Sequence, residues 1–423
     1  MSFETISVVG LGYIGLPTAA MFASRKKKVI GVDVNQHAVN TINKGKIHIV
    51  EPELDMIVHA AVSEGFLKAT TTPEPADAFL IAVPTPFLPC KEGEVPAPDL
   101  SYIKAASKAI APVLKKGDLV ILESTSPVGA TEQMAEWLST LRPDLTFPQN
   151  HGSQADINIA HCPERVLPGH VVRELVDNDR VIGGLTPKCS ERSVELYRTF
   201  VKGECVITNA RTAEMAKLTE NSSRDVQIAF ANELSIICDK LDINVWELIA
   251  LANRHPRVNI LQPGPGVGGH CIAVDPWFIV SKTPEEAKII HTARTVNDGK
   301  PSWVIHKTKM TIAEFLQENV DKTVKDITIA CYGLAFKPDI DDLRESPAMQ
   351  IVKEIAFSHA GKVIAVEPNI HQLPESLEKL VTLKSLDVAK SEADVHVMLV
   401  DHTEFKSEPL NVKYLVDTKG IWL

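Results

Sequence analysis

The 423-residue sequence predicts an α/β protein with two doubly wound parallel-sheet domains that are joined by a long helical segment. Three observations support this prediction. The first and the last parts of the chain both alternate short β-branched runs with helical patterns, which is typical of parallel sheets. The middle part carries helical patterns without strand signals. We therefore expect domains at residues 1–205, 206–300 and 301–423.

The expected strands of the first domain are short apolar runs. They lie at Thr5–Val9, Val29–Val32, Ala78–Val83, Leu119–Leu122 and Arg180–Ile182. A proline-rich stretch at residues 84–98 follows the third of these runs and predicts a loop. Ligands of open sheets bind beyond the carboxyl ends of the strands, so this loop, which includes Thr85, is expected to border a binding site.

Residues 211–253 predict long helices, with Asn209 or Thr212 as the N-terminal cap. This segment carries more apolar side chains than one buried face needs, namely Ile228, Phe230, Leu234 and Ile237. We therefore expect a homodimer built on these helices. The alternative is that all four side chains lie in the core of one chain.

A second α/β domain is predicted after a helical stretch at residues 303–319. Its expected strands are Ile327–Tyr332, Lys362–Val366, Val395–Val400 and Tyr414–Val416. A helix is expected at Ala348–His359, between the first two of these strands.

The composition favours a small-molecule partner in the cytoplasm. A net charge of −10 gives no basic surface for nucleic acid. No apolar run approaches the roughly 20 residues needed to cross a membrane, and the N-terminus lacks the pattern of a signal peptide. The seven cysteines form no C-x-x-C pair, which favours reduced thiols. The pairs His161-Cys162 and His270-Cys271 lack the spacing of a zinc site, so no metal is expected.

The sequence Gly-Leu-Gly-Tyr-Ile-Gly at residues 10–15 follows the first strand and opens a helical stretch, which is the context of a dinucleotide-binding loop. Gly10 permits the tight turn, Gly12 lets the backbone approach a pyrophosphate, and Gly15 lets helix and strand pack closely. The second strand ends at Asp33, an acid placed to accept hydrogen bonds from an adenosine ribose. The alternative is that Asp33 caps the helix that starts near Asn35.

Together these features predict a Rossmann-like domain that binds NAD. A carboxylate beside the ribose repels a 2′-phosphate, so NAD is expected rather than NADP. The residues expected to contact the cofactor are Gly10, Gly12, Tyr13, Ile14, Gly15, Asp33 and Thr85.

A second glycine-rich segment, residues 264–271, lacks the context of a dinucleotide-binding loop. Its four glycines let the main chain approach a bulky ligand and place Cys271 beside that ligand. The alternative is a flexible turn followed by an inert cysteine. Lys217 and Asn221 lie four residues apart on one face of a predicted helix and favour the catalytic interpretation. Lys217 would favour the thiolate form of a nearby cysteine and, with Asn221, would stabilise an oxyanion.

Several segments, in this order along the chain, resemble the UDP-glucose dehydrogenase superfamily. They are residues 10–15, Ser124–Gly129, Cys162–Arg165, the helix with Lys217 and Asn221, Gly264–Cys271, Phe336–Pro338 and Leu343–Ser346. The match spans essentially the whole chain. The sequence of Pro263–Asp275 is most similar to the branch of the superfamily that acts on UDP-N-acetylmannosamine.

The resemblance implies an NAD domain, a helical dimerisation segment and a second Rossmann-like domain that binds a UDP-sugar, with the active site between the two α/β domains. The implied reaction oxidises the C6 alcohol of the sugar to a carboxylate with two molecules of NAD, in the synthesis of surface-polysaccharide precursors. Cys271 would carry a thioester, Lys217 and Asn221 would stabilise oxyanions, and Asp275 would assist proton transfer.

The resemblance also implies contacts for other residues. Thr125 and Glu164 match positions that order water and serve general-base chemistry, and Thr125 also matches a cofactor contact. Substrate contacts are implied for Arg165, Val166, Lys217, Asn221, Arg257, Phe336 and Lys337, and a cofactor contact is implied for Arg344. The alternative for each arginine is a surface ion pair.

One departure from the superfamily leaves the general base open between Glu164 and Asp275. UDP-glucose enzymes carry a second glutamate shortly after the position of Glu164, where this chain has Pro168 and Gly169. The alternative functions are 6-dehydrogenation of UDP-N-acetylglucosamine or UDP-glucose, and an NAD-binding redox sensor. An epimerase or a simple alcohol dehydrogenase would use a tyrosine-lysine pair or a zinc site, and neither stands out in the sequence.

Overall fold

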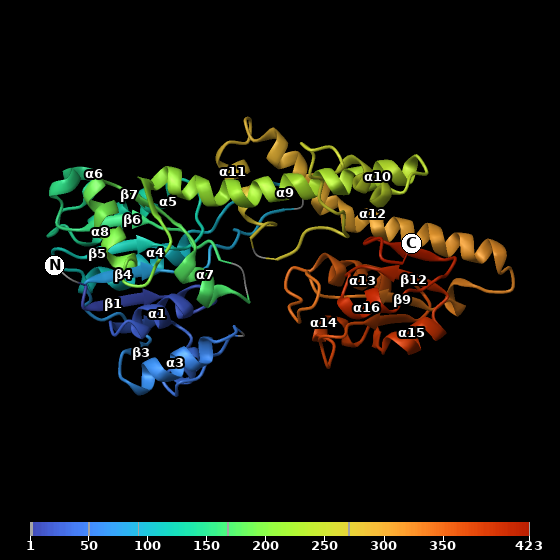
Figure 1. Ribbon diagram of the computed structural model, residues 1–423, viewed down its shortest axis with the longest axis horizontal. Helices are drawn as coiled ribbons and strands as arrows, with labels where there is room; N and C mark the ends of the chain where they lie inside the picture. Colours follow the sequence, from blue (N-terminus) through green and yellow to red (C-terminus); the bar gives the residue numbers. More distant parts are fainter. Residues whose placement is uncertain (1–2, 50, 92, 167–168, 270, 423) are drawn as a thin grey trace. The chain divides into compact units, whose positions relative to one another are not determined.

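The computed structural model describes residues 3–49, 51–91, 93–166, 169–269 and 271–422. The chain forms two compact units, Met1–Glu220 and Asn221–Leu423. Both units contain a sheet with helices on its two faces (Figure 1), so the predicted α/β class is confirmed. Among the helices of these described ranges, none is long and apolar enough to cross a membrane.

The sheet of the first unit has eight strands in the order β3-β2-β1-β4-β5-β6-β7-β8. They are β1 Thr5–Val9, β2 Lys28–Val32, β3 Leu67–Thr70, β4 Ala78–Ile81, β5 Leu119–Leu122, β6 Asn158–His161, β7 Arg180–Gly184 and β8 Cys205–Asn209. Neighbouring strands are parallel except β6 and β7, which are antiparallel. The predicted parallel sheet is therefore confirmed, with one antiparallel pair that the sequence did not predict.

The five strands predicted for this unit are present, and β3, β6 and β8 were not predicted. The sequences of β3 (LKAT) and β6 (NIAH) contain polar residues and few β-branched ones, so they carry a weak strand signal. Side chains of β4 and β5 alternate between two cores, as they must in a sheet that is covered on both faces.

Helices on the two faces of this sheet complete those cores. The helices of the first unit are α1 Gly15–Ser24, α2 Gln36–Ile42, α3 Leu54–Ser63, α4 Ser101–Ile110, α5 Ala130–Leu141, α6 Pro148–His151, α7 Val171–Asp177 and α8 Pro187–Tyr197. One core contains side chains of α1, α3, α7 and α8, and the other contains side chains of α4 and α5. In such a sheet, ligands bind beyond the carboxyl ends of the parallel strands.

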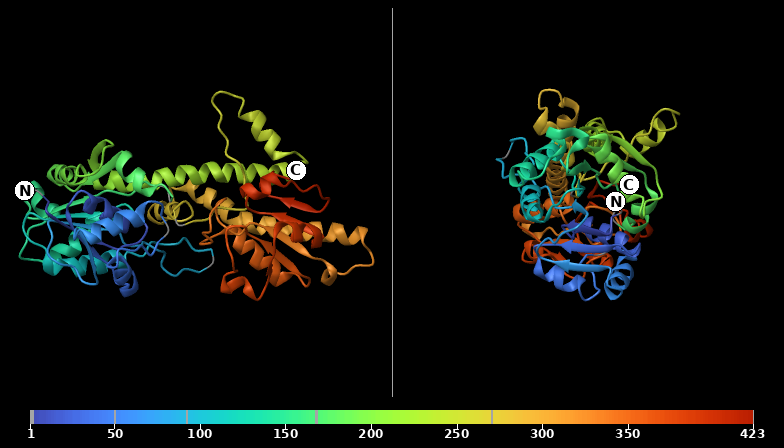
Figure 2. Two further views of the ribbon diagram at one scale, coloured as in Figure 1. Left: turned by 60° about the horizontal axis from the view of Figure 1, so that its bottom comes forward. Right: turned by 90° about the vertical axis from the view of Figure 1, so that its left-hand side faces the viewer.

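The predicted helical segment is confirmed as α9 Ala210–Lys240 and α10 Val245–Ala252, and α9 is one unbroken helix in Figures 1 and 2. The Oδ1 atom of Asn209 accepts the N–H of Thr212 at 2.9 Å, so Asn209 is the cap and Thr212 is not. Helices α11 Asp275–Lys282 and α12 Lys288–Glu318 follow. The predicted start of α12 near residue 303 was too late, because Pro301 lies inside this helix, where proline usually breaks one.

The sheet of the second unit has five parallel strands in the order β11-β10-β9-β12-β13. They are β9 Ile329–Tyr332, β10 Val363–Val366, β11 Thr382–Leu383, β12 Val395–Met398 and β13 Leu415–Asp417. Its other helices are α13 Pro347–Ser358, α14 Glu375–Glu378, α15 Leu386–Glu392 and α16 Thr403–Ser407. Side chains of α12 and α13 pack on one face, and those of α15 and α16 pack on the other. All four predicted strands are confirmed, and only the two-residue β11 was missed.

Candidate active site

The loop at residues 10–15 has the geometry of a dinucleotide-binding turn. Gly10 has a φ of +92°, and a Cβ atom there would lie 2.5 Å from the carbonyl oxygen of Ala82. A Cβ on Gly15 would lie 1.8 Å from the carbonyl oxygen of Gly10. A Cβ on Gly12 would meet nothing within 4 Å, so this backbone is open to a ligand. The glycines therefore fit the pyrophosphate of NAD at the first turn of α1.

The Asp33 carboxylate holds this loop. Its Oδ2 atom accepts the N–H of Leu11 at 2.8 Å, and its Oδ1 atom accepts the N–H of Asn35 at 2.8 Å. Asn35 itself caps α2, because its side chain accepts the N–H groups of His37 and Ala38. The interpretation of Asp33 as the helix cap is therefore wrong. A carboxylate has about four acceptor positions, so Asp33 can still accept hydrogen bonds from ribose hydroxyls.

Thr85 and Thr125 meet at the carboxyl edge of the same sheet. They follow β4 and β5, and β4 lies beside β1. The Thr85 hydroxyl donates to the Thr125 carbonyl oxygen at 2.5 Å, and the Ser124 hydroxyl donates to the Val83 carbonyl oxygen at 2.6 Å. The structure therefore brings both threonines to the edge where the Gly10 turn lies.

Glu164 lies in the loop after β6 and is 6% exposed. Its Oε2 atom lies 2.8 Å from Nη1 of Arg180, which is 3% exposed, and its Oε1 atom accepts the N–H of Arg165 at 2.6 Å. The Arg180 guanidinium also lies 5.0 Å from the centre of the Tyr197 ring. The Tyr197 hydroxyl donates to the buried Glu123 at 2.6 Å. Burial raises the pKa of Glu123 to about 7, although Arg180 opposes this shift.

Arg165 and Glu220 form a two-point ion pair, with Nε–Oε2 at 3.1 Å and Nη2–Oε1 at 2.6 Å. For Arg165 the structure therefore shows an ion pair, which was the alternative to a substrate contact. Val166 packs against the core that contains α1. Lys217 and Asn221 are both partly buried and lie four residues apart on α9, as predicted.

The buried carboxylate of Glu214 fixes the start of α9 to the N-terminus of α5. Its Oε2 atom accepts the N–H of Gly129 at 2.7 Å, and its Oε1 atom accepts the N–H and the hydroxyl of Thr131 at 2.8 and 2.6 Å. These donors lie at the N-terminus of α5, where a negative charge is stabilised. This anchor lies less than one turn before Lys217.

In the second unit, Cys271 has an exposed side chain and begins the turn that leads into α11. Its carbonyl oxygen accepts the N–H groups of Val274 at 3.1 Å and Asp275 at 2.9 Å. Asp275 is 2% exposed, and its Oδ2 atom accepts the Asn221 side-chain amide at 2.5 Å. The structure thus joins Asn221 to the segment that carries Cys271. His270 lies outside the described residues.

The glycines before Cys271 let this segment approach another loop. A Cβ on Gly268 would lie 2.5 Å from the Glu345 carbonyl oxygen and 2.9 Å from Cβ of Phe336. A Cβ on Gly269, where φ is +82°, would lie 3.2 Å from the Phe336 ring. We predicted that these glycines let the main chain approach a ligand. At Gly268, however, the groups that lie close are Glu345 and Phe336 of the same chain. The cysteine segment and the Phe336 loop therefore pack together.

A buried polar network holds the start of the cysteine segment. The N–H of Gly264 donates to Oδ1 of Asn232 at 2.9 Å. The Asn232 amide donates to Asn297, and the Asn297 amide donates to Asp225, at 2.9 and 2.8 Å. Arg294 pairs with Asp225 at 2.6 Å. Helices α9 and α12 thus position the segment through groups that the sequence analysis did not identify.

Phe336, Lys337 and Arg344 share the loop that follows β9. Lys337 is exposed, and Arg344 forms a two-point pair with Asp342 at 2.9 and 2.6 Å. Arg257 is exposed in the turn after α10. Phe336, Lys337 and Arg344 therefore lie in one loop, as expected for residues that share a binding site. Arg257 belongs to another segment of the second unit.

Models of one family match most of the chain. They are the NAD binding domain of the UDP-glucose/GDP-mannose dehydrogenase family at residues 4–201, its central domain at residues 211–299 and its UDP binding domain at residues 330–422. The chain belongs to the UDP-glucose/GDP-mannose dehydrogenase family. It is therefore an NAD-dependent oxidoreductase of nucleotide-sugars, and the predicted cofactor is confirmed.

Individual relatives match over the full length. The chain is 68% identical to a UDP-N-acetyl-D-mannosamine dehydrogenase of Yersinia pestis, with 100% of both chains covered. It is 63% identical to an NDP-N-acetyl-D-galactosaminuronic acid dehydrogenase of Ralstonia nicotianae, covering 100% of this chain and 97% of the relative. A solved UDP-D-ManNAc dehydrogenase of Pyrococcus horikoshii is similar with a TM-score of 0.84 and 40% identity, covering 99% of this chain and 96% of that one. The predicted superfamily is thus confirmed.

Proposed function

We propose that this family member oxidises the C6 alcohol of UDP-N-acetyl-D-mannosamine to the uronate through a thioester on Cys271, as a step toward surface polysaccharides. The identity of 68% over the full length to an enzyme named for this substrate carries the choice of sugar. The relative named for N-acetyl-galactosaminuronic acid, at 63%, makes another 2-acetamido sugar the alternative.

The chemistry rests on what a thiol can do in the second of two oxidations. When bound, NAD accepts the hydride in each oxidation. An aldehyde cannot lose hydride until a nucleophile adds to it, and addition of the Cys271 sulfur gives a thiohemiacetal that can. Loss of that hydride leaves a thioester. Water then cleaves the C–S bond, which releases the acid and returns the thiol.

The contacts around Cys271 support this proposal. Asn221 and Asp275 are joined by a hydrogen bond of 2.5 Å, and Asp275 is tied to the Cys271 backbone. Asn221 and Lys217 would stabilise the oxyanions. Asp275 is the proposed general base, because the Glu164 carboxylate already pairs with buried Arg180. Glu164 and Thr125 would order water at the edge of the first sheet.

The proposed ligand contacts divide between the two units. Tyr13, Ile14, Asp33, Thr85 and Thr125 would contact NAD, together with Arg344. The residues proposed to contact the UDP-sugar are Arg165, Val166, Lys217, Asn221, Arg257, Phe336 and Lys337. An NAD-binding redox sensor would not need the Asn221–Asp275 pair, so the enzyme is the better-supported function.

A panel of UDP-sugars tests the choice of substrate. Purified enzyme with NAD is expected to release two NADH per molecule of UDP-N-acetyl-D-mannosamine, measured by absorbance at saturating cofactor. UDP-glucose should be a poor substrate, since a polar pocket built for the acetamido group leaves donors and acceptors unpaired without it. Turnover of UDP-glucose without turnover of the mannosamine derivative would refute the proposed substrate.

We also propose a homodimer on α9 and α10. Phe230 and Ile237 on α9 are 52% and 43% exposed, and Leu251 on α10 is 59% exposed. The alternative that all the apolar side chains of this segment lie in one chain's core is therefore wrong for Phe230 and Ile237. Light scattering at micromolar concentration should give the mass of a dimer, and Phe230→Glu should shift it toward the monomer. A wild-type monomer under these conditions would contradict the proposal.

A further inference from the structure

The turn after β9 repeats the backbone contacts of the NAD turn. The N–H of Gly333 donates to the Val366 carbonyl oxygen at 2.8 Å, as the N–H of Gly10 does to Val32 at 2.8 Å. The N–H of Leu334 donates to Oε2 of Glu367 at 2.7 Å, which matches the contact of Leu11 with Asp33. Glu367 thus holds the same position in the second sheet that Asp33 holds in the first. In a dinucleotide-binding domain, an acid at this position binds the ribose.

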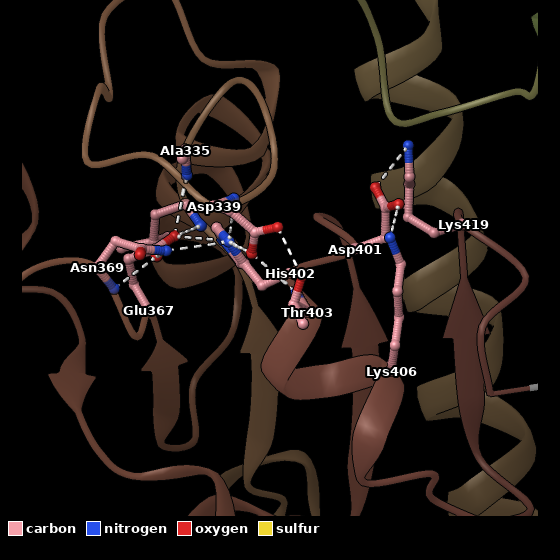
Figure 3. Close-up of polar contacts among 10 residues, drawn as sticks. Ala335, Asp339, Glu367, Asn369, Asp401, His402, Thr403, Lys406 and Lys419 are labelled. Atoms are coloured by element: carbon pink, nitrogen blue, oxygen red, sulfur yellow. Dashed lines mark hydrogen bonds and ion pairs between the residues drawn. The ribbon is translucent and has the colours of Figure 1, made fainter. Parts of the chain in front are cut away.

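Glu367 differs from Asp33 in what surrounds its carboxylate. It is 4% exposed, and Oε2 also accepts the N–H of Ala335 at 3.1 Å. Oε1 accepts the backbone N–H and the side-chain amide of Asn369, both at 3.1 Å. The fully buried ring of His402 completes the set, with Nε2 at 3.0 Å from Oε2 (Figure 3). The carboxylate is therefore enclosed by the protein and cannot face a ribose.

The other side of the His402 ring fixes the far end of the same loop. Nδ1 of His402 accepts the N–H of Asp339 at 2.9 Å (Figure 3). With Nδ1 as the acceptor, Nε2 carries the hydrogen and donates it to Glu367, so the contacts agree on one neutral tautomer. Burial would raise the pKa of Glu367, but the hydrogen bonds from His402 and Leu334 hold it below its ordinary value.

Asp339 is held in a strained backbone conformation. Its φ is +61°, in the left-handed region that residues other than glycine rarely adopt. Its carboxylate accepts the N–H of Thr403 at 2.8 Å and the Thr403 hydroxyl at 2.7 Å, while its own N–H is held by His402. Such conformations persist where surrounding contacts over-determine them, and they cluster at ligand clamps.

Between these two fixed ends lie only Phe336, Lys337 and Pro338, which we call the arch. We propose that Glu367 and His402 are positioning residues that hold the arch in the conformation that binds the UDP-sugar. This inference rests on the proposed function, in which Phe336 and Lys337 contact the substrate. Neither Glu367 nor His402 touches the reacting atoms in this proposal. Without the Glu367 and His402 side chains, the arch would have to become ordered when the UDP-sugar binds. The entropy lost in that ordering would weaken the affinity for the UDP-sugar.

Nδ1 of His402 also lies 3.1 Å from the side-chain amide nitrogen of Asn369. Substitutions at His402 separate its contact with Glu367 from its contact with the Asp339 N–H. His402→Leu removes both, and His402→Asn retains an acceptor near the position of Nδ1 for the Asp339 N–H. His402→Leu should raise the KM for the UDP-sugar and weaken the calorimetric Kd for UDP by about tenfold or more, with kcat within about twofold. His402→Asn should recover part of this loss. The KM for NAD should change less than the KM for the UDP-sugar, because Asp33 and the glycine turn lie in the other unit and only Arg344, among the proposed cofactor contacts, shares the loop with the arch.

His396→Leu is the matched control. His396 lies on β12 and is 2% exposed, and its Nδ1 atom lies 2.8 Å from the Tyr332 hydroxyl. Its loss should lower the melting temperature but leave the Kd for UDP and the KM near wild type. An unchanged Kd in folded His402→Leu and His402→Asn, or an equal weakening in His396→Leu, would overturn the positioning role.

The same experiment separates this inference from the proposed function. A wild-type enzyme that binds UDP but oxidises no UDP-sugar would refute the proposed function, and the calorimetric Kd values would still test the arch. A wild-type enzyme that oxidises UDP-sugar, with variants that bind UDP normally, would refute only the positioning role. Wild-type protein that binds no UDP would refute both.

Discussion

Replacing Cys271 by alanine is expected to abolish formation of the uronate. Without the sulfur no thiohemiacetal forms, so the second hydride has no donor and at most one NADH is released per sugar. NADH release and the acid product, quantified by absorbance and mass spectrometry, measure this effect. Binding of NAD should stay near wild type, because the glycine turn lies in the first unit.

Two companion variants sharpen this experiment. Cys271→Ser retains a hydroxyl that can add to the aldehyde, but the oxygen ester formed from it hydrolyses slowly, so a covalent sugar adduct should accumulate on the protein. Cys205→Ser, in the edge strand β8, removes a partly buried thiol elsewhere and should retain activity. Uronate formation by Cys271→Ala at a rate near wild type would require a hydrated aldehyde in place of the thioester.

Replacing Arg180 by leucine is expected to destabilise the first unit by about 3–5 kcal/mol. Arg180 and Glu164 are 3% and 6% exposed, and the substitution leaves the Glu164 carboxylate buried without its counter-charge. Urea unfolding followed by circular dichroism measures the loss. Arg173→Leu is the control, since the Arg173–Asp177 pair is exposed and should contribute at most about 1 kcal/mol.

A double substitution tests the reason for this loss. Arg180→Leu combined with Glu164→Leu removes both charges, and a buried pair replaced by apolar residues is often neutral in stability. The double variant should therefore recover most of the free energy of unfolding that the single variant loses, as expected for residues in contact. A double variant as unstable as Arg180→Leu would show that the arginine stabilises the unit through its packing on Tyr197 instead.

Features carried by contiguous residues could be predicted from the sequence. The turn at residues 10–15 follows its strand and opens its helix within one short stretch, so the dinucleotide-binding turn could be predicted from the sequence. Lys217 and Asn221 were also predictable as neighbours, because helical periodicity places residues four apart on one face. The strands with long buried apolar runs, such as β1 and β5, were found from the sequence, whereas β8 was missed although its sequence, CVITN, is β-branched.

Contacts between distant residues could not be predicted in this way. Glu214 binds backbone groups more than 80 residues before it, and Glu367 is paired with a histidine 35 residues after it. A single buried acid gives no local pattern, since its partner is brought to it by the topology of the sheet. The start of α12 could not be predicted for the same reason. Pro301 locally disfavours a helix, but tertiary packing keeps α12 helical through it.

The continuity of α9 also constrains how the family can change. Glu214 ties this helix to the N-terminus of α5, and Asn221, two turns later, donates to Asp275. Each residue added between Lys217 and Asn221 would rotate Asn221 by about 100° around the helix axis and shift it by about 1.5 Å along that axis. Loops such as residues 84–98 can absorb insertions during evolution, whereas the stretch from Lys217 to Asn221 must keep its length for these two side chains to retain their shared face.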